Sequence, residues 1–195
     1  MKKSLLIIVS ASVFLAACNS EPKITQKDET ANDAKVKSMA TPVDPVDQKM
    51  KELKSLAPIG LDALSAWLPS QLNGSKRSNL TMSSDMGYTV AHADYEKNSK
   101  TDMRVTVYDC SGEAGAGKYK AIFANKMKEQ QENEEGYTKT IDFLGDKAVE
   151  RHEKKNKLTT LTFMTDNRIL VVVSARNFEP EKVREASEKI AKKSS

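Results

Sequence analysis

Apolar residues recur along the chain with two different periods, and each period predicts a kind of element. Spacings of three and four residues, the period of one helix face, occur over residues 46–56 and again over residues 61–68. A proline and a glycine separate the two segments, and Pro69 ends the second. We therefore expect two short helices, the second of which carries the single tryptophan, Trp67, as a core anchor.

An alternation of apolar and polar residues follows, which is typical of strands with one solvated face. It covers residues 88–93 and 103–110, with a polar turn at residues 97–100 between them. A glycine-rich link, residues 111–117, then leads to a helix that we expect over residues 118–134. The acidic end of this helix should fray, because the helix dipole disfavours negative charge there.

The last third of the chain predicts a β-meander and a closing helix that opens at Pro180. Short turn-forming links separate four strand-like segments, residues 138–144, 148–153, 158–165 and 168–175. Residues 169–173 are continuously apolar, which favours a central strand covered on both faces. Together the elements predict an α+β fold, an antiparallel sheet of about six strands with helices packed on it.

The composition narrows the class of protein. The chain has 195 residues, of which 38% are hydrophobic and 30% charged, a size that suits one domain with accessory segments. Its 31 basic and 27 acidic residues give a net charge of +4, too small a surplus for a dedicated nucleic-acid binder. Two cysteines are too few for a disulfide-stapled miniprotein or a four-cysteine zinc module.

The N-terminus has the three parts of an export signal. Lys2 and Lys3 give it a positive start, and a largely apolar stretch follows at residues 5–15. These 11 residues are far short of the ~20 that a helix needs to span a bilayer. The small residues Ala16 and Ala17 then suit the narrow cleft of a signal peptidase.

The run Leu15-Ala16-Ala17-Cys18 resembles the lipobox of bacterial lipoproteins. The resemblance implies that residues 1–17 are a signal peptide, and that Cys18 is the first mature residue and carries the acyl chains, such as palmitate. In the enterobacterial sorting pattern, Asn19 in place of aspartate favours the outer membrane over the inner one. The alternative is an ordinary secretory signal with an incidental cysteine.

Residues 18–45 should form the lipidated cysteine and a flexible tether, followed by a single domain over residues 46–195. The 27 residues after Cys18 contain no aromatic side chain and cannot bury enough surface to offset their ordering entropy. A flexible coil of this length has an r.m.s. span of roughly 30 Å. The domain is therefore expected on the periplasmic face, close to the membrane that the acyl chains anchor.

The mature chain also carries weaker resemblances. The segment LSAWLPSQLNGSKR at residues 64–77, followed by an alternating strand and VTVYD, resembles a group of small bacterial lipoproteins. The order of helix, two strands, helix, meander and final helix is similar to PsbP-like α/β folds of exported proteins. Both resemblances concern architecture, and neither implies a functional residue or a cofactor.

One segment matches the spacing of a phosphate-binding loop. Residues 112–118, GEAGAGK, fit the pattern G-x-x-x-x-G-K, in which backbone N–H groups and a lysine hold phosphate. Tyr119 stands where Ser or Thr would hold Mg²⁺, so the metal handle is missing. We expect a flexible loop before a helix with Lys118 near its start, with a weak anion site as the alternative.

The two histidines, His92 and His152, fall inside expected strands. Glu150 and His152 should share one strand face, with Arg151 and Glu153 on the other. A site with two carboxylates and two histidines is the metal-binding alternative, but a catalytic zinc usually has three protein ligands and helical H-E-x-x-H spacing is absent. We expect solvated strand faces and no metal.

Cys110 is the one thiol that lipidation would leave. No histidine adjacent in sequence activates it as a nucleophile, so a buried free cysteine is the expected reading. Pairing between two molecules is the alternative. Asp109, directly before it, should cap the glycine-rich turn.

Three functions remain open from the sequence. We favour a non-enzymatic, monomeric accessory or binding domain of the envelope, because no nucleophile, metal or cofactor constellation is evident. Its apolar groove would lie near Trp67 and the sheet beneath it. A carrier of lipid or another small ligand requires an apolar pocket between sheet and helices. An envelope hydrolase requires close, perturbed carboxylates, for which Glu150, His152 and Asp109 are the candidates.

Overall fold

A computed structural model describes residues 44–98 and 101–192, and every structural statement below concerns this part of the chain. The signal peptide, Cys18 and nearly all of the expected tether lie outside it. Within the described residues, no helix is long and apolar enough to cross a membrane.

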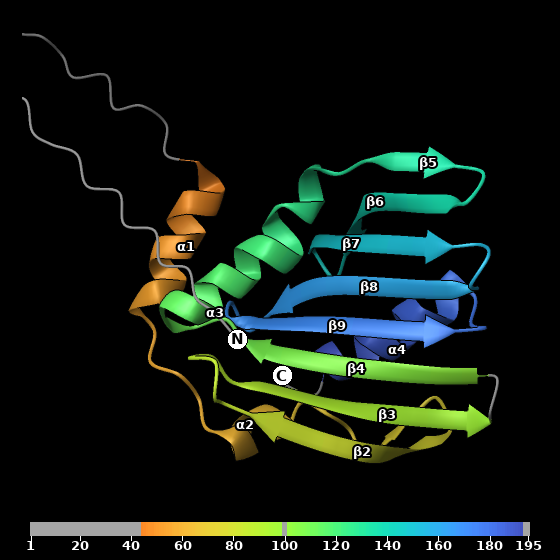
Figure 1. Ribbon diagram of the computed structural model, residues 1–195, viewed down its shortest axis with the longest axis horizontal. Coiled ribbons are helices and arrows are strands. Elements are labelled where there is room, and N and C mark those ends of the chain that lie inside the picture. Colours follow the sequence, from red (N-terminus) through yellow and green to blue (C-terminus); the bar gives the residue numbers. More distant parts are fainter. Residues whose placement is uncertain (1–43, 99–100, 193–195) are drawn as a thin grey trace, which may run out of the picture. The chain divides into compact units, whose positions relative to one another are not determined.

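The described chain folds into one antiparallel sheet of nine strands with helices packed on it (Figure 1), in the spatial order β1-β2-β3-β4-β9-β8-β7-β6-β5. The strands are β1 (Gln71–Leu72), β2 (Ser75–Ser83), β3 (Val90–Asn98), β4 (Thr101–Asp109), β5 (Gln131–Asn133), β6 (Gly136–Phe143), β7 (Asp146–Glu153), β8 (Leu158–Thr165) and β9 (Ile169–Arg176). The expected α+β class with an antiparallel sheet is confirmed, but the expectation of about six strands is wrong.

The first and last helices of the domain lie close to where the sequence predicts them. The helices are α1 (Pro45–Ser55), α2 (Leu61–Ser65), α3 (Gly112–Tyr119) and α4 (Pro180–Ala191), with a π turn, η1 (Lys120–Ala124), and a 3₁₀ turn, η2 (Lys126–Lys128), continuing α3. Asp44 caps α1 by accepting a hydrogen bond from the Val46 N–H at 2.8 Å, and a proline opens both α1 and α4.

The main core lies on one face of the sheet, under α2 and α4. Figure 1 shows α4 behind the strands, where its Val183, Ala186 and Ile190 are buried. β9 runs between β4 and β8, and Leu161 and Val173 from β8 and β9 join this core. The expected central strand over residues 169–173 is confirmed, since all of these residues except Val172 are buried.

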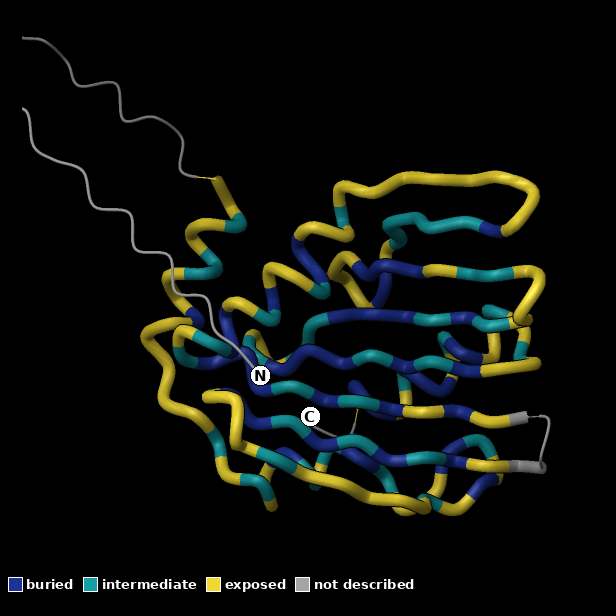
Figure 2. The backbone as a smooth tube through the Cα atoms, viewed as in Figure 1, coloured by how far each residue is buried: buried dark blue, intermediate teal, exposed yellow. Residues whose placement is uncertain are grey.

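A second core covers only one end of the opposite face. There α1 and α3 contact each other, and Leu53 and Phe123 pack with Val149 and Leu170 of the sheet. Figure 2 shows buried and half-buried residues in the middle strands and exposed residues along the outer ones. Helices thus cover one face widely and the other only at the end where β4 finishes.

The structure corrects three expectations about elements. β2 was missed, because its sequence SKRSNLTMS is mostly exposed on both faces and lacks a clear apolar alternation. The expected helix over residues 118–134 begins earlier, at Gly112, and ends by Lys128. Its expected fraying acidic end is instead β5 and a turn, where Asn133 Oδ1 accepts hydrogen bonds from the N–H groups of Glu135 and Gly136.

Candidate functional site

The glycine-rich segment is a helix and not the flexible loop that the sequence predicted. Gly112 opens α3 with φ +71°, and Gly115 lies against the end of β4, where an added Cβ would be 2.6 Å from the carbonyl carbon of Cys110. Lys118 lies in the last turn, with its Nζ 4.9 Å from the centre of the Tyr88 ring. Gly115 therefore permits close packing of helix on strand, and Lys118 is not at the helix start.

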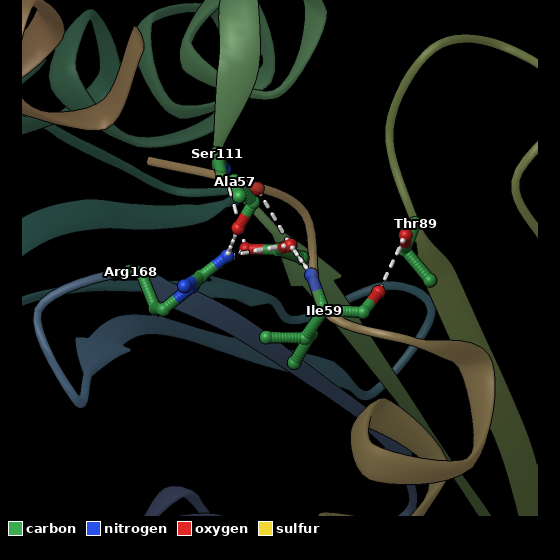
Figure 3. Close-up of polar contacts among 6 residues, drawn as sticks. Ala57, Ile59, Thr89, Ser111 and Arg168 are labelled. Carbon is green, nitrogen blue, oxygen red and sulfur yellow. Dashed lines mark hydrogen bonds and ion pairs between the residues drawn. The ribbon is translucent and has the colours of Figure 1, made fainter. Parts of the chain in front are cut away.

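Asp109 forms the best-connected polar cluster of the domain (Figure 3). Its carboxylate is fully buried and accepts two hydrogen bonds from Arg168, both at 2.9 Å. It also accepts from the Ile59 N–H at 2.8 Å and from the hydroxyl and backbone N–H of Ser111 at 2.6 and 3.2 Å. Asp109 thus caps the turn that leads into the glycine-rich segment, as expected.

The Asp109 cluster joins segments that are distant in sequence. Arg168 also donates to the carbonyl of Ala57 at 2.6 Å, and Thr89 donates to the carbonyl of Ile59 at 3.2 Å (Figure 3). Burial alone would raise the pKa of Asp109, but the bonds from Arg168, Ser111 and Ile59 outweigh it, and the pKa lies below its ordinary value. The ionised carboxylate therefore fastens the α1–α2 connection to the sheet.

Cys110 is a free cysteine with no exposed surface. Burial, reinforced by the adjacent Asp109 charge, raises the pKa of its thiol to about 12. A thiol with that pKa is protonated at neutral pH, and its burial keeps substrates away from it. Neither property suits a nucleophile.

Glu150 forms a second buried cluster, beneath α4. It is fully buried and accepts hydrogen bonds from Arg184 at 2.5 and 2.7 Å and from the Tyr137 hydroxyl at 2.9 Å, with Lys139 at 3.5 Å. Burial would raise the pKa of Glu150, but Arg184 and Tyr137 hold it below its ordinary value. Burial and the contact with this carboxylate raise the pKa of Tyr137. This cluster anchors α4 to β6 and β7.

The two candidate carboxylates are not brought together. Asp109 lies on β4 and Glu150 on β7, with β9 and β8 between them. Three strand spacings of ~4.8 Å separate them by at least about 14 Å. Glycosidase pairs need roughly 5–9.5 Å, so the two groups are too far apart to act on one bond.

The histidines are also apart. His92 lies on β3 and His152 on β7, four strand positions away in the sheet. His152 shares a strand face with Glu150, as expected, and its Nδ1 lies 2.9 Å from the Thr159 hydroxyl. In the described ranges, no group of three or more His, Cys, Asp or Glu side chains could hold a metal ion.

Trp67 is the residue near which the sequence predicts an apolar groove. It is half-buried and packs against the main core, whose centre is filled by side chains of the sheet, α2 and α4. Neither of the two hollows described next is lined by it. The groove expected near Trp67 therefore stays a prediction.

Two open hollows lie at opposite ends of the β6–β7 hairpin. The first, of about 360 Å³, is lined mainly by polar residues, including Asn133, Thr138, Arg151 and Glu153. The second, of about 550 Å³, lies between α3 and the β8–β9 turn. It is lined in part by one methionine and four aromatic rings, Met164, Tyr119, Phe123, Phe143 and Phe163.

The outer edge of β2 is the most exposed apolar strand surface. β1 pairs only with Ser75 and Lys76, and the Arg77 N–H then donates to the Ser70 carbonyl at 2.9 Å. Beyond Arg77, no described strand lies outside β2 in the sheet order. Apolar side chains gather along and just after this free edge, with exposed fractions of 39% for Leu80, 37% for Met82 and 65% for Met86.

The two edges of the sheet differ in kind. β5, at the opposite edge, is three residues long, wholly polar and fully exposed. Short, polar strands are a common way to protect a sheet edge, whereas an exposed edge with apolar side chains is a template for pairing with another strand. The β2 edge is therefore our candidate binding surface, and no sequence pattern pointed to it.

No family model, curated protein or solved structure matches this chain.

Proposed function

We propose that this protein is a lipid-tethered, non-enzymatic binding domain of the bacterial envelope, held at the periplasmic face of the outer membrane by acyl chains on Cys18. The lipobox-like run at residues 15–18 supports the tether. The single observation that supports binding is the free outer edge of β2, where unpaired backbone groups and the exposed side chains of Leu80 and Met82 lie together.

The two buried carboxylates are ionised and fully hydrogen-bonded, which favours a binding protein over a hydrolase. Asp109 and Glu150 are each saturated by an arginine and further hydrogen bonds, and the pKa of each is lowered. A general acid needs a raised pKa and access to substrate, and neither group has them. Both carboxylates instead join secondary-structure elements to the sheet.

The tether is tested by metabolic labelling of the full chain with a palmitate analogue. The parental chain should incorporate the label, and the Cys18→Ser chain should not. Equal labelling of both chains, or of neither, would contradict a lipid on Cys18.

The binding surface is tested by chemical crosslinking in intact cells. A lysine in place of Met82 puts a charge in the middle of the β2 edge, so Met82→Lys should abolish the crosslinked complexes. Leu144→Lys is the matched control, because Leu144 is 51% exposed but lies in the β6–β7 turn, away from β2. Complexes that survive Met82→Lys would rule out the β2 edge.

The hollow of about 550 Å³ supports a second candidate, a carrier of an amphipathic small ligand. Its volume lies within the ~300–1,000 Å³ of typical ligand sites, and aromatic rings form part of its wall. Phe123 belongs to this wall. A fluorescent fatty acid should bind the parental chain and bind Phe123→Ala at least about tenfold more weakly, and no saturable binding would exclude the carrier.

A further inference from the structure

We propose that the occupant of the β2 edge is the β2 edge of a second copy of this chain, paired antiparallel about a two-fold axis at Thr81. The inference rests on the proposed binding function and names its partner. It departs from the monomer that the sequence predicted, because β2 itself could not be recognised from the sequence.

The N–H and C=O groups of successive β2 residues point alternately towards β3 and away from it, and only those that point away can pair with another strand. The Thr89 carbonyl accepts a hydrogen bond from β4, so Thr89 faces β4. Because this direction alternates along an antiparallel strand, His92 faces β2 and its partner Thr81 faces β3. Leu80 and Met82, on either side of Thr81, therefore direct their N–H and C=O groups away from the sheet.

These directions select one register. Pairing Leu80 of one copy with Met82 of the other satisfies the outward backbone groups of both residues, and does so twice across the axis. Thr81, Met82 and Ser83 are paired continuously with β3, whereas Leu80 lies inside the register shift between Ser78 and Thr81 and follows Asn79, whose φ is +48°. The free edge begins after Arg77, whose outer side is occupied by Ser70, and so extends to either side of Thr81.

In this register, the apolar side chains of Leu80 and Met82 from the two copies would lie on the same face of the sheet. Met82 lies opposite Ala91, a core residue, so Met82 and Leu80 lie on the core face of the sheet and Thr81 on the other. The register would place the two Leu80 and two Met82 side chains in one apolar row across the interface. Figure 2 shows the strand that carries them as largely exposed along the lower edge of the sheet.

Charge also favours antiparallel pairing of two copies. Lys76 and Arg77 lie at one end of the free edge, and the exposed Asp85 follows the other end. An antiparallel pair brings the basic end of each copy towards the acidic end of the other, whereas a parallel pair would bring like charges together. The charges at the two ends of the edge therefore favour the antiparallel orientation, although the Arg77 guanidinium also donates to the Leu68 carbonyl at 2.6 Å.

Disulfide crosslinking of the full chain in its membranes tests the axis. In the proposed dimer the two Thr81 Cα atoms are ~4.5–5.5 Å apart, within the range of a disulfide, so Thr81→Cys should form a covalent dimer under mild oxidation. Ser78→Cys is the matched control on the same exposed edge. Its two copies would be roughly 20 Å apart, so its dimer should be at least about tenfold less abundant.

A dimer specific to Thr81→Cys supports a second copy, with the parental chain controlling for Cys18 and Cys110. Equal crosslinking of both variants, or a crosslink from Thr81→Cys to a different envelope protein, overturns the second copy, and the different protein leaves the binding function standing. No crosslink from a Thr81→Cys variant whose melting temperature equals the parental one overturns the second copy, and the crosslinking of Met82→Lys in intact cells then decides the binding function separately.

The affinity gives an independent measurement. Sedimentation of the full chain in detergent should show a monomer–dimer equilibrium. Met82→Lys removes both Leu80–Met82 pairs and should raise the dissociation constant by about tenfold or more, whereas Leu144→Lys should leave it within about twofold. A sedimentation profile that is monomeric for all three chains overturns the dimer.

Discussion

At the scale of single residues, two buried carboxylates determine how the helices attach to this sheet. Asp109 and Glu150 have no exposed side-chain surface, and each meets an arginine, Arg168 or Arg184, that is separated from it by 59 or 34 residues in sequence. Burying a charge is costly unless it is paired and hydrogen-bonded, and both carboxylates satisfy this condition. The ion pairs of both carboxylates therefore hold secondary-structure elements together, and we assign neither carboxylate to a reaction.

Removing one partner of such a pair leaves a buried charge uncompensated. Asp109→Ala should lower the free energy of unfolding by about 3 kcal/mol, measured by urea denaturation, because Arg168 is only 18% exposed. Asp94→Ala is the control. Asp94 pairs with Arg104, which is 60% exposed, and the loss there should be below about 1 kcal/mol. Equal losses for the two variants would contradict a special role for Asp109.

The same carboxylates predict how stability depends on pH. The folded-state pKa values of Asp109 and Glu150 are lowered, so their stabilising contribution is complete above the unfolded values of ~3.9 and ~4.3. It is lost as the pH falls through the folded values. Urea midpoints measured from pH 6 to pH 2 should therefore fall, and Glu150→Gln should reduce the slope. An unchanged slope would show that Glu150 does not contribute.

At the scale of elements, the fit of α3 against the end of β4 depends on one glycine. A methyl group at Gly115 would be 2.6 Å from the carbonyl carbon of Cys110, whereas a methyl group at Gly117 would meet nothing within 4 Å. The two glycines share a helix, so the comparison isolates packing from helix propensity. The glycine that this packing needs is Gly115, which is not one of the two glycines of the phosphate-loop spacing, Gly112 and Gly117.

Gly115→Ala should destabilise the domain by about 1–3 kcal/mol, because helix and strand must separate. Gly117→Ala should instead stabilise it by up to about 1 kcal/mol, since alanine favours helix over glycine. Thermal unfolding of both variants measures the difference. Stabilisation by both substitutions would show that α3 does not pack closely on β4.

The elements that sequence predicts are those with strong periodicity. The meander from β6 to β9 and α4 could be located because apolar alternation, tight turns and Pro180 mark them. β2 and β5 could not, because neither has a clear alternation of apolar and polar residues and both are mostly exposed. The arginine partners of the carboxylates were also missed, since only the tertiary fold brings Arg168 to Asp109 and Arg184 to Glu150.

At the scale of the whole molecule, the proposed tether sets where the binding edge can act. One acyl chain holds only marginally, and each further buried methylene contributes ~0.8 kcal/mol, so two or three chains on Cys18 would make the attachment effectively permanent. In the described part of the chain, the first helix, α1, begins at Pro45, and the tether over residues 18–45 stays a prediction. Copies held on one membrane are concentrated beside one another, which favours pairing along β2.

Intact-mass spectrometry of the chain purified from its native membranes tests the tethered domain most directly. We expect a polypeptide that begins at Cys18, lacks residues 1–17 and exceeds its sequence mass by a diacylglycerol with or without one further acyl chain. A polypeptide of unmodified mass that retains residues 1–17 and is recovered from the cytosol would contradict it.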